Sequence, residues 1–148
     1  MERSTTLDSI TKIGQEVTLC GWVHVRRDHG KIIFIDLRDR WGLVQVVFAD
    51  AAAPLYAVAD TLRPEWVVKI TGLVKQRPEK MVNPNLSTGK IEVEARELIV
   101  LNVAKTPPFA LDTDGYEVGE EHRMRYRYLD LRRGRMKNNM VMRNGIIQ

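Results

Sequence analysis

The sequence predicts a small, mainly β barrel domain followed by a short helical segment. Five stretches within the first 102 residues show the alternating apolar pattern of strands, and a stretch between the third and fourth of them has helical spacing instead. The chain has 148 residues, of which 44% are hydrophobic, enough for one globular core with an appendage.

The expected elements follow one another closely along the chain. Strands are predicted over residues 17–27, 32–38, 43–48, 66–74 and 91–102, and a short helix over residues 55–62. Gly72 indicates a bulge or a bend in the fourth strand. Residues 76–90 lack periodicity and contain two prolines, so they predict a long loop. This order matches the OB-fold, a five-stranded Greek-key barrel that binds oligonucleotides. An SH3-like barrel is the second candidate, but it gives no reason for the helix.

The pattern changes after the fifth strand. Pro107 and Pro108 end strand pairing and stiffen the chain, so residues 105–121 are expected to form a hinge. A helical stretch from Met136 has an apolar stripe that nothing in this chain would cover. We therefore predict a barrel over residues 1–104, a linker over 105–121 and the start of another domain over 122–148. We interpret the chain as a piece of a longer protein.

The net charge of +4 is unevenly distributed. Residues 1–104 carry 14 Lys and Arg against 13 Asp and Glu, whereas residues 105–121 have a net charge of −4 and residues 122–148 of +7. The basic excess thus belongs to the last segment. Nucleic-acid binding by the barrel must depend on where individual side chains point.

The sequence gives little support to several other classes of function. The single cysteine, Cys20, rules out a disulfide within the chain, and no segment is typical of a membrane span or signal peptide, so a cytoplasmic protein is expected. His24, His29 and His122 lack partners at metal-ligand spacing, so no metal site is expected. Phosphate-binding loops and nucleophile motifs are absent as well. We expect no catalytic residues and no cofactor in this chain.

The second and third strands carry the candidate binding surface. Alternation in the second strand places three apolar residues on the core face, namely Ile33, Ile35 and Leu37. Phe34 should therefore point outward, where an aromatic ring beside cationic groups can hold single-stranded nucleic acid. Gln45 can lie nearby and read a base edge. Arg26 and Arg27 point to opposite faces, so only one joins this surface easily unless the strand is bulged.

Other polar and aromatic residues have weaker signals. The loop over residues 76–90 contains Arg77, Lys80 and two asparagines, which suit contacts with phosphates and base edges. Trp22 and Trp41 are expected to pack rather than to stack on a base.

Six stretches, in order along the chain, resemble the N-terminal part of bacterial-type aspartyl-tRNA synthetases, which are class II enzymes. They are residues 21–28, 34–39, 44–48, 82–93, 105–109 and 125–133. Lysyl- and asparaginyl-tRNA synthetases share the fold and a looser version of the first strands. They lack the Arg-Arg-Asp-His-Gly turn and the Asn-Pro-Asn loop of this chain.

The resemblance implies that the barrel recognises a tRNA anticodon. Phe34 would stack on the central uridine and Gln45 would read it, while Arg27, Asn83 and Glu92 would contact the flanking anticodon bases. For the longer protein it implies ATP-dependent aspartylation of tRNA-Asp with ATP and Mg²⁺, and a homodimer. Residues 126–133 resemble the entrance to the class II catalytic domain, and residues 136–148 the start of the motif 1 helix at the dimer interface. Motifs 2 and 3 are missing, so the chain alone would bind tRNA and catalyse nothing.

Two residues bear on which tRNA is accepted. His29 resembles family members that charge tRNA-Asn as well as tRNA-Asp, whereas Lys80 resembles the strict members. The sequence therefore leaves this choice open. A free-standing OB-fold that binds single-stranded nucleic acid or tRNA, and a protein–protein interaction module, are the alternative functions. The segment resembling a catalytic-domain entrance argues against both.

Overall fold

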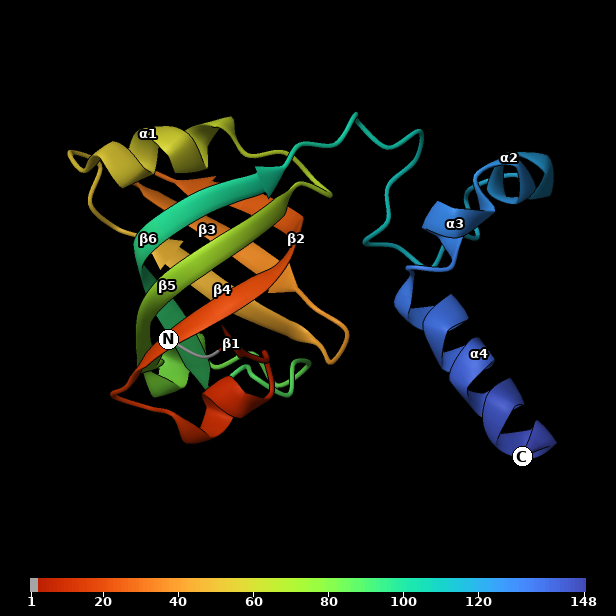
Figure 1. Ribbon diagram of the computed structural model, residues 1–148, viewed down its shortest axis with the longest axis horizontal. Helices are drawn as coiled ribbons and strands as arrows, with labels where there is room; N and C mark the ends of the chain where they lie inside the picture. The colour runs from red at the N-terminus through yellow and green to blue at the C-terminus, as the bar shows by residue number, and fades with distance from the viewer. Residues whose placement is uncertain (1–2) are drawn as a thin grey trace. The chain divides into compact units, whose positions relative to one another are not determined.

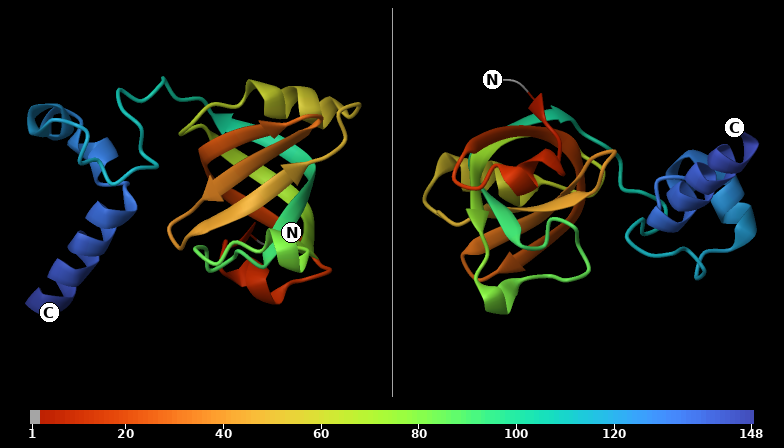
Figure 2. Two further views of the ribbon diagram at one scale, coloured as in Figure 1. Left: turned by 180° about the vertical axis from the view of Figure 1, so that it is seen from behind. Right: turned by 90° about the horizontal axis from the view of Figure 1, so that it is seen from below.

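The computed structural model describes residues 3–148, which divide into two compact units, one ending at Thr106 and the other beginning at Pro107. The first unit is a β-barrel (Figures 1 and 2). Its elements, in chain order, are β1 (Arg3–Ser4), η1 (Asp8–Thr11), β2 (Glu16–His29), β3 (Ile32–Arg38), β4 (Leu43–Phe48), α1 (Pro54–Thr61), β5 (Val67–Gln76), η2 (Glu79–Met81) and β6 (Ile91–Asn102).

Strand pairing closes the barrel. The order is β2, β3, β4, β6 and β5, with β5 returning to β2. Among these pairings only that of β4 with β6 is parallel. With 14 residues, β2 can pair with β5 along its first half and with β3 along its second. This topology confirms the predicted OB-fold. The parallel pairing of β1 with β2 was not predicted, because two residues are too few to show a period.

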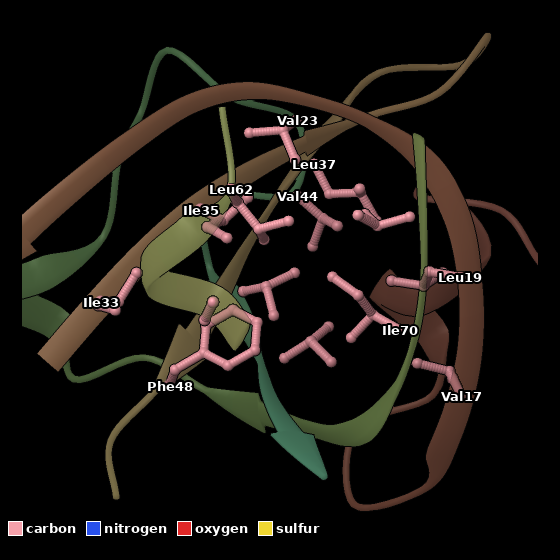
Figure 3. Packing of buried hydrophobic residues seen from close by; sticks show 14 of the residues in the cluster. Val17, Leu19, Val23, Ile33, Ile35, Leu37, Val44, Phe48, Leu62 and Ile70 are labelled. Atoms are coloured by element: carbon pink, nitrogen blue, oxygen red, sulfur yellow. The ribbon is translucent and has the colours of Figure 1, made fainter. Parts of the chain in front are cut away.

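The core lies inside the barrel, where the inward side chains of all five long strands meet (Figure 3). α1 lies across one end of the barrel (Figure 1) and adds Ala59 to the core, and Leu62, the residue after the helix, also joins the core. The three apolar residues predicted for the core face of β3 are each at most 1% exposed. The expected core face of β3 is thus confirmed, and its other face is left for Phe34.

A bulge in β2 changes which of its side chains face outward. Strand partners shift between Val23 and Val25, so His24 is the extra residue. Val23 is fully buried. Unbroken alternation from Val23 would turn Arg27 inward, but after the bulge Arg27 lies opposite Phe34 on the outer face. The register between β5 and β6 shifts at Thr71 and Gly72, but the residue without a strand partner is Arg96, so the bulge lies in β6 and not in the fourth predicted strand.

The second unit contains α2 (Glu120–Arg125), α3 (Arg127–Asp130) and α4 (Gly134–Ile147). The side chains of Asp130 and Arg133 are fully buried, with Arg133 Nε donating to Asp130 Oδ1 at 3.1 Å. Arg133 Nη1 also donates to the Thr113 carbonyl oxygen at 2.7 Å. Gly115 has φ +80°, and a Cβ there would lie 2.7 Å from the Arg133 guanidinium. Across residues 3–148 no helix is long and apolar enough to cross a membrane.

Candidate nucleic-acid interface

Six side chains from β2, β3, β4, β6 and the β5–β6 loop form the outer-face cluster. Its members are Arg27, Phe34, Asp36, Gln45, Arg77 and Glu92. Phe34 lies opposite Arg27 on one neighbouring strand and Val47 on the other, and Asp36 lies opposite Gln45. Phe34 is partly exposed and is absent from the hydrophobic core. An aromatic ring is thus presented on the sheet opposite a cationic side chain, and the amide of Gln45 lies diagonally across from it, two residues from Val47 on β4.

Arg27 is held beside the ring of Phe34 by two parallel hydrogen bonds. Its Nη1 and Nη2 atoms donate to the two carboxylate oxygens of Asp36 at 2.8 and 2.7 Å. The side chain of Asp36 is 11% exposed, whereas that of Arg27 is 50% exposed. A bidentate pair fixes the plane of the guanidinium and leaves further N–H donors on its exposed side. Arg27 can therefore meet a ligand without reorganising.

Gln45 is oriented by a chain of polar contacts that runs inward. Gln45 Nε2 donates to Glu92 Oε2 at 3.3 Å, and Arg77 Nε lies 3.7 Å from the same oxygen. Because the amide nitrogen of Gln45 faces Glu92, its carbonyl oxygen Oε1 is the end turned away. The cluster thus presents a hydrogen-bond acceptor beside the ring of Phe34.

Arg77 is the buried base of this chain of contacts. The residue is 7% exposed, and its Nε atom lacks a hydrogen-bond partner among the described residues. Desolvation lowers the pKa of Arg77 from its usual value, and the carboxylates of Glu92 and Asp36 oppose that shift. We expected this arginine to suit phosphate contacts. It is instead buried, with its guanidinium next to the Glu92 carboxylate. Sequence reasoning missed this role, because Arg77 stands just after the last residue of a strand.

The loop between β5 and β6 is folded tightly against the barrel. Thr88 Oγ1 donates to the Leu43 carbonyl oxygen at the start of β4. The Asn83 side-chain oxygen accepts from Asn85 N at 3.0 Å, so the Asn83 amide nitrogen is the end left for a ligand. Gly89 is required here, because a Cβ would lie 1.8 Å from the Asn83 carbonyl oxygen. The long loop expected from the sequence therefore has a defined shape.

The remaining candidates lie apart from the outer-face cluster. Asn83 and Lys80 belong to the loop between β5 and β6, and His29 ends β2 beside the tight turn to β3. Lys80 and His29 are both exposed. In the described part of the chain, no hydrogen bond or ion pair joins Asn83, Lys80 or His29 to the cluster. Arg26 faces the other side of β2 and pairs with Asp60 of α1 at 2.5 Å.

The two tryptophans differ from each other. Trp22 is partly buried, with the Arg38 guanidinium 5.8 Å from its ring centre. Trp41 is 52% exposed in the turn between β3 and β4, so the expectation that it packs is wrong. Within residues 3–148 no group of three or more His, Cys, Asp or Glu side chains could hold a metal ion.

Comparison with known proteins gives a consistent result. The family described as an OB-fold nucleic acid binding domain, tRNA_anti-codon, matches residues 17–101. The chain is 52% identical over 138 residues to the aspartate–tRNA(Asp/Asn) ligase of Rubrobacter xylanophilus, covering 93% of this chain and 23% of that protein. It is 58% identical over 130 residues to the enzyme of the same name from Moorella thermoacetica, covering 88% and 22%. The chain thus spans less than a quarter of the length of these curated relatives.

Solved structures show the same fold. Asparaginyl-tRNA synthetase from Pyrococcus horikoshii, complexed with asparaginyl-adenylate, aligns with a TM-score of 0.72 at 26% identity, covering 90% of this chain and 29% of that one. A protein named OBody AM2EP06, bound to hen egg-white lysozyme, aligns with a TM-score of 0.60 at 28% identity, covering 70% and 96%. Because the family match covers more than half of its residues, the chain belongs to the family of OB-fold nucleic acid binding domains named for the tRNA anticodon.

Proposed function

We propose that this chain recognises a tRNA anticodon as the N-terminal part of an aspartate–tRNA ligase. The observation that carries the proposal is the partly exposed ring of Phe34 on the sheet face, with Arg27 opposite it on β2 and Gln45 diagonally across from it on β4. The names and high identity of the two ligase relatives support it. ATP-dependent aspartylation, with ATP and Mg²⁺ bound outside this chain, belongs to the proposal for the longer protein. So do a homodimer and a cytoplasmic location.

The geometry favours uridine as the base held on Phe34. A base stacked on the ring would meet Gln45 Oε1, the acceptor turned away from Glu92. Uridine carries a hydrogen on N3 and can donate it to this oxygen. Cytidine has an acceptor at the same position, so two acceptors would face each other without a hydrogen bond. Purines are larger and would displace the base edge. Stacking supplies affinity, and the amide supplies discrimination.

The flanking bases would meet three other side chains. Arg27 offers exposed N–H donors, Glu92 offers a carboxylate acceptor that is 25% exposed, and Asn83 offers its amide nitrogen. The outer-face cluster therefore offers a donor from Arg27 and an acceptor from Glu92, and the loop beyond it adds the donor of Asn83. Their roles as contacts to the first and third anticodon bases remain predictions.

We expect selective but modest binding to an anticodon stem-loop. The barrel has a net charge close to zero, so it attracts phosphates weakly, and base contacts must provide the discrimination. Fluorescence anisotropy should show tighter binding to a stem-loop with a central uridine than to the same RNA with a central cytidine. Equal affinities would contradict anticodon recognition and favour a free-standing general binder of single-stranded nucleic acid.

The same titration addresses the choice between tRNA-Asp and tRNA-Asn. We propose that the chain accepts tRNA-Asp and tRNA-Asn. A histidine at position 29 resembles the family members that charge the two tRNAs, and the two ligase relatives carry Asp/Asn in their names. Lys80 argues for the strict class. The two anticodons share the central uridine and differ in the third base. A marked preference of the chain for the aspartate stem-loop would contradict relaxed recognition.

Removal of residues 105–148 should leave the barrel folded and selective. The core and all six strands lie before this point, and Trp66 Nε1 donates to the retained Ala104 carbonyl oxygen at 3.0 Å. The OBody alignment supports this, because the matching barrel makes up 96% of that chain. Affinity should fall most at low salt, since the removed tail is basic. Melting curves and stem-loop titrations at two salt concentrations measure both effects. Unfolding, or loss of selectivity, would show that the tail belongs to the recognition domain.

A further inference from the structure

We propose that Trp41 is a second stacking site for an unpaired base of the same RNA loop, on the side of the β5–β6 loop. This inference rests on the proposed anticodon recognition and extends it beyond the base held by Phe34. Trp41 is 52% exposed, although a tryptophan usually buries most of its large apolar surface. The ring is thus available to a ligand on the first unit.

The turn that carries Trp41 is held firmly. Asp39 is 7% exposed, and its Oδ1 atom accepts from Trp41 N at 2.7 Å and from Gly42 N at 3.0 Å. Thr6 donates to the same carboxylate through N at 2.8 Å and Oγ1 at 2.7 Å. A buried aspartate thereby fixes the backbone on which the ring stands. Fixing the backbone of the turn before binding reduces the entropy lost on binding.

The ring has a cation beside it. The guanidinium carbon of Arg40 lies 5.0 Å from the centre of the Trp41 ring, within cation–π distance. An arginine next to an exposed aromatic ring suits a nucleotide, because the ring stacks on the base and the cation attracts the phosphate. These two residues repeat the combination found at Phe34 and Arg27. A nucleotide therefore fits this turn better than an apolar peptide does.

The position of the turn fixes which part of the RNA could reach it. Phe34 lies opposite Val47, and the four residue steps from Val47 to Leu43 span about 14 Å along β4. Trp41 stands beyond Leu43, so its base cannot be the one stacked on Phe34. A Cβ built on Gly42 would lie 3.9 Å from Ser87 Oγ, which places the turn against the β5–β6 loop. The RNA would thus pass this loop on its way from one ring to the other.

The test is a stem-loop titration with Trp41→Ala and Trp41→Phe. We expect Trp41→Ala to weaken binding about 5- to 100-fold, as for loss of one stacked base, and Trp41→Phe to retain most of the affinity. The preference for central uridine over cytidine should not change. Tyr116→Ala is a matched control, because Tyr116 is 78% exposed with Arg135 4.5 Å from its ring centre, but lies in the second unit. It should bind like the unaltered chain.

Stem-loops with one abasic nucleotide at each unpaired position locate the base. The loss caused by Trp41→Ala should disappear for one abasic RNA, not the one that lacks the central base. Three results would overturn the proposal. Trp41→Ala could bind within twofold of the unaltered chain, it could lose the same affinity with every abasic RNA, or Tyr116→Ala could lose as much affinity as Trp41→Ala. Phe34→Ala separates the two ideas. If Phe34→Ala weakens binding and Trp41→Ala does not, only the second site is wrong. If the unaltered chain binds no stem-loop, both are wrong.

Discussion

Replacing Phe34 by alanine should weaken binding to the anticodon stem-loop by about 1–3 kcal/mol and leave the barrel folded. The ring lies outside the core, on the face opposite to three buried neighbours of β3. Its loss therefore removes a stacking surface without opening a cavity inside the barrel. Stem-loop affinity and the melting temperature, both measured on the same preparation, test the two halves of this expectation.

Ile35→Ala is the matched control for this result. Ile35 is adjacent in sequence and 0% exposed, so its truncation leaves a cavity and should cost about 2–5 kcal/mol of the free energy of unfolding. The folded fraction of this variant should still prefer central uridine. A crossed result is expected, in which one variant loses affinity and the other loses stability. If Phe34→Ala loses as much stability as Ile35→Ala, Phe34 is a structural residue of the core.

Much of the fold could be predicted because alternation in the sequence is strong. The second, third and fifth predicted strands have the bounds of β3, β4 and β6, and the helix between strands appears as α1. The first strand is longer than predicted, since Asp28 and His29 are polar on both faces and carry no period. β1 escaped prediction for a related reason, because pairing to β2 and not its own pattern makes it a strand.

The candidate site was only partly predictable. Alternation gave the outward positions of Phe34 and Gln45, since each stands between buried apolar neighbours. The choice between Arg26 and Arg27 depended on the bulge at His24, which has no glycine or other local signal. The burial of Arg77 depended on how the loop folds back over the barrel, which is a tertiary effect. Exposed Trp41 was assigned to packing on the general tendency of tryptophan, which the Asp39-fixed turn overrides.

Glu92→Gln should destabilise the barrel by about 2–3 kcal/mol, more than Arg77→Met does, because it removes one partner of a buried ion pair. Glu92 carries the carboxylate closest to the Arg77 guanidinium, which is 5% exposed in its side chain and remains charged. Without that carboxylate the buried cation keeps only the carboxylate of Asp36, which is already paired with Arg27. In Arg77→Met the group left without its partner is the Glu92 carboxylate, whose side chain is 25% exposed and can be hydrated. The two variants should therefore lose unequal amounts of stability. Both losses should be smaller than for an ion pair in which both side chains are fully buried.

A double-mutant cycle tests this asymmetry. Chemical denaturation of both single variants and of the Glu92→Gln/Arg77→Met double variant gives the coupling energy. The double variant should recover much of the stability lost in Glu92→Gln, because it no longer buries a charge. The preference for a central uridine should fall in both single variants. In Glu92→Gln the Gln45 amide loses the carboxylate that orients it, and in Arg77→Met that carboxylate loses the guanidinium next to it. Equal losses of stability in the two single variants, with no recovery in the double variant, would show that Arg77 and Glu92 act independently. That result would also show that other contacts position Gln45.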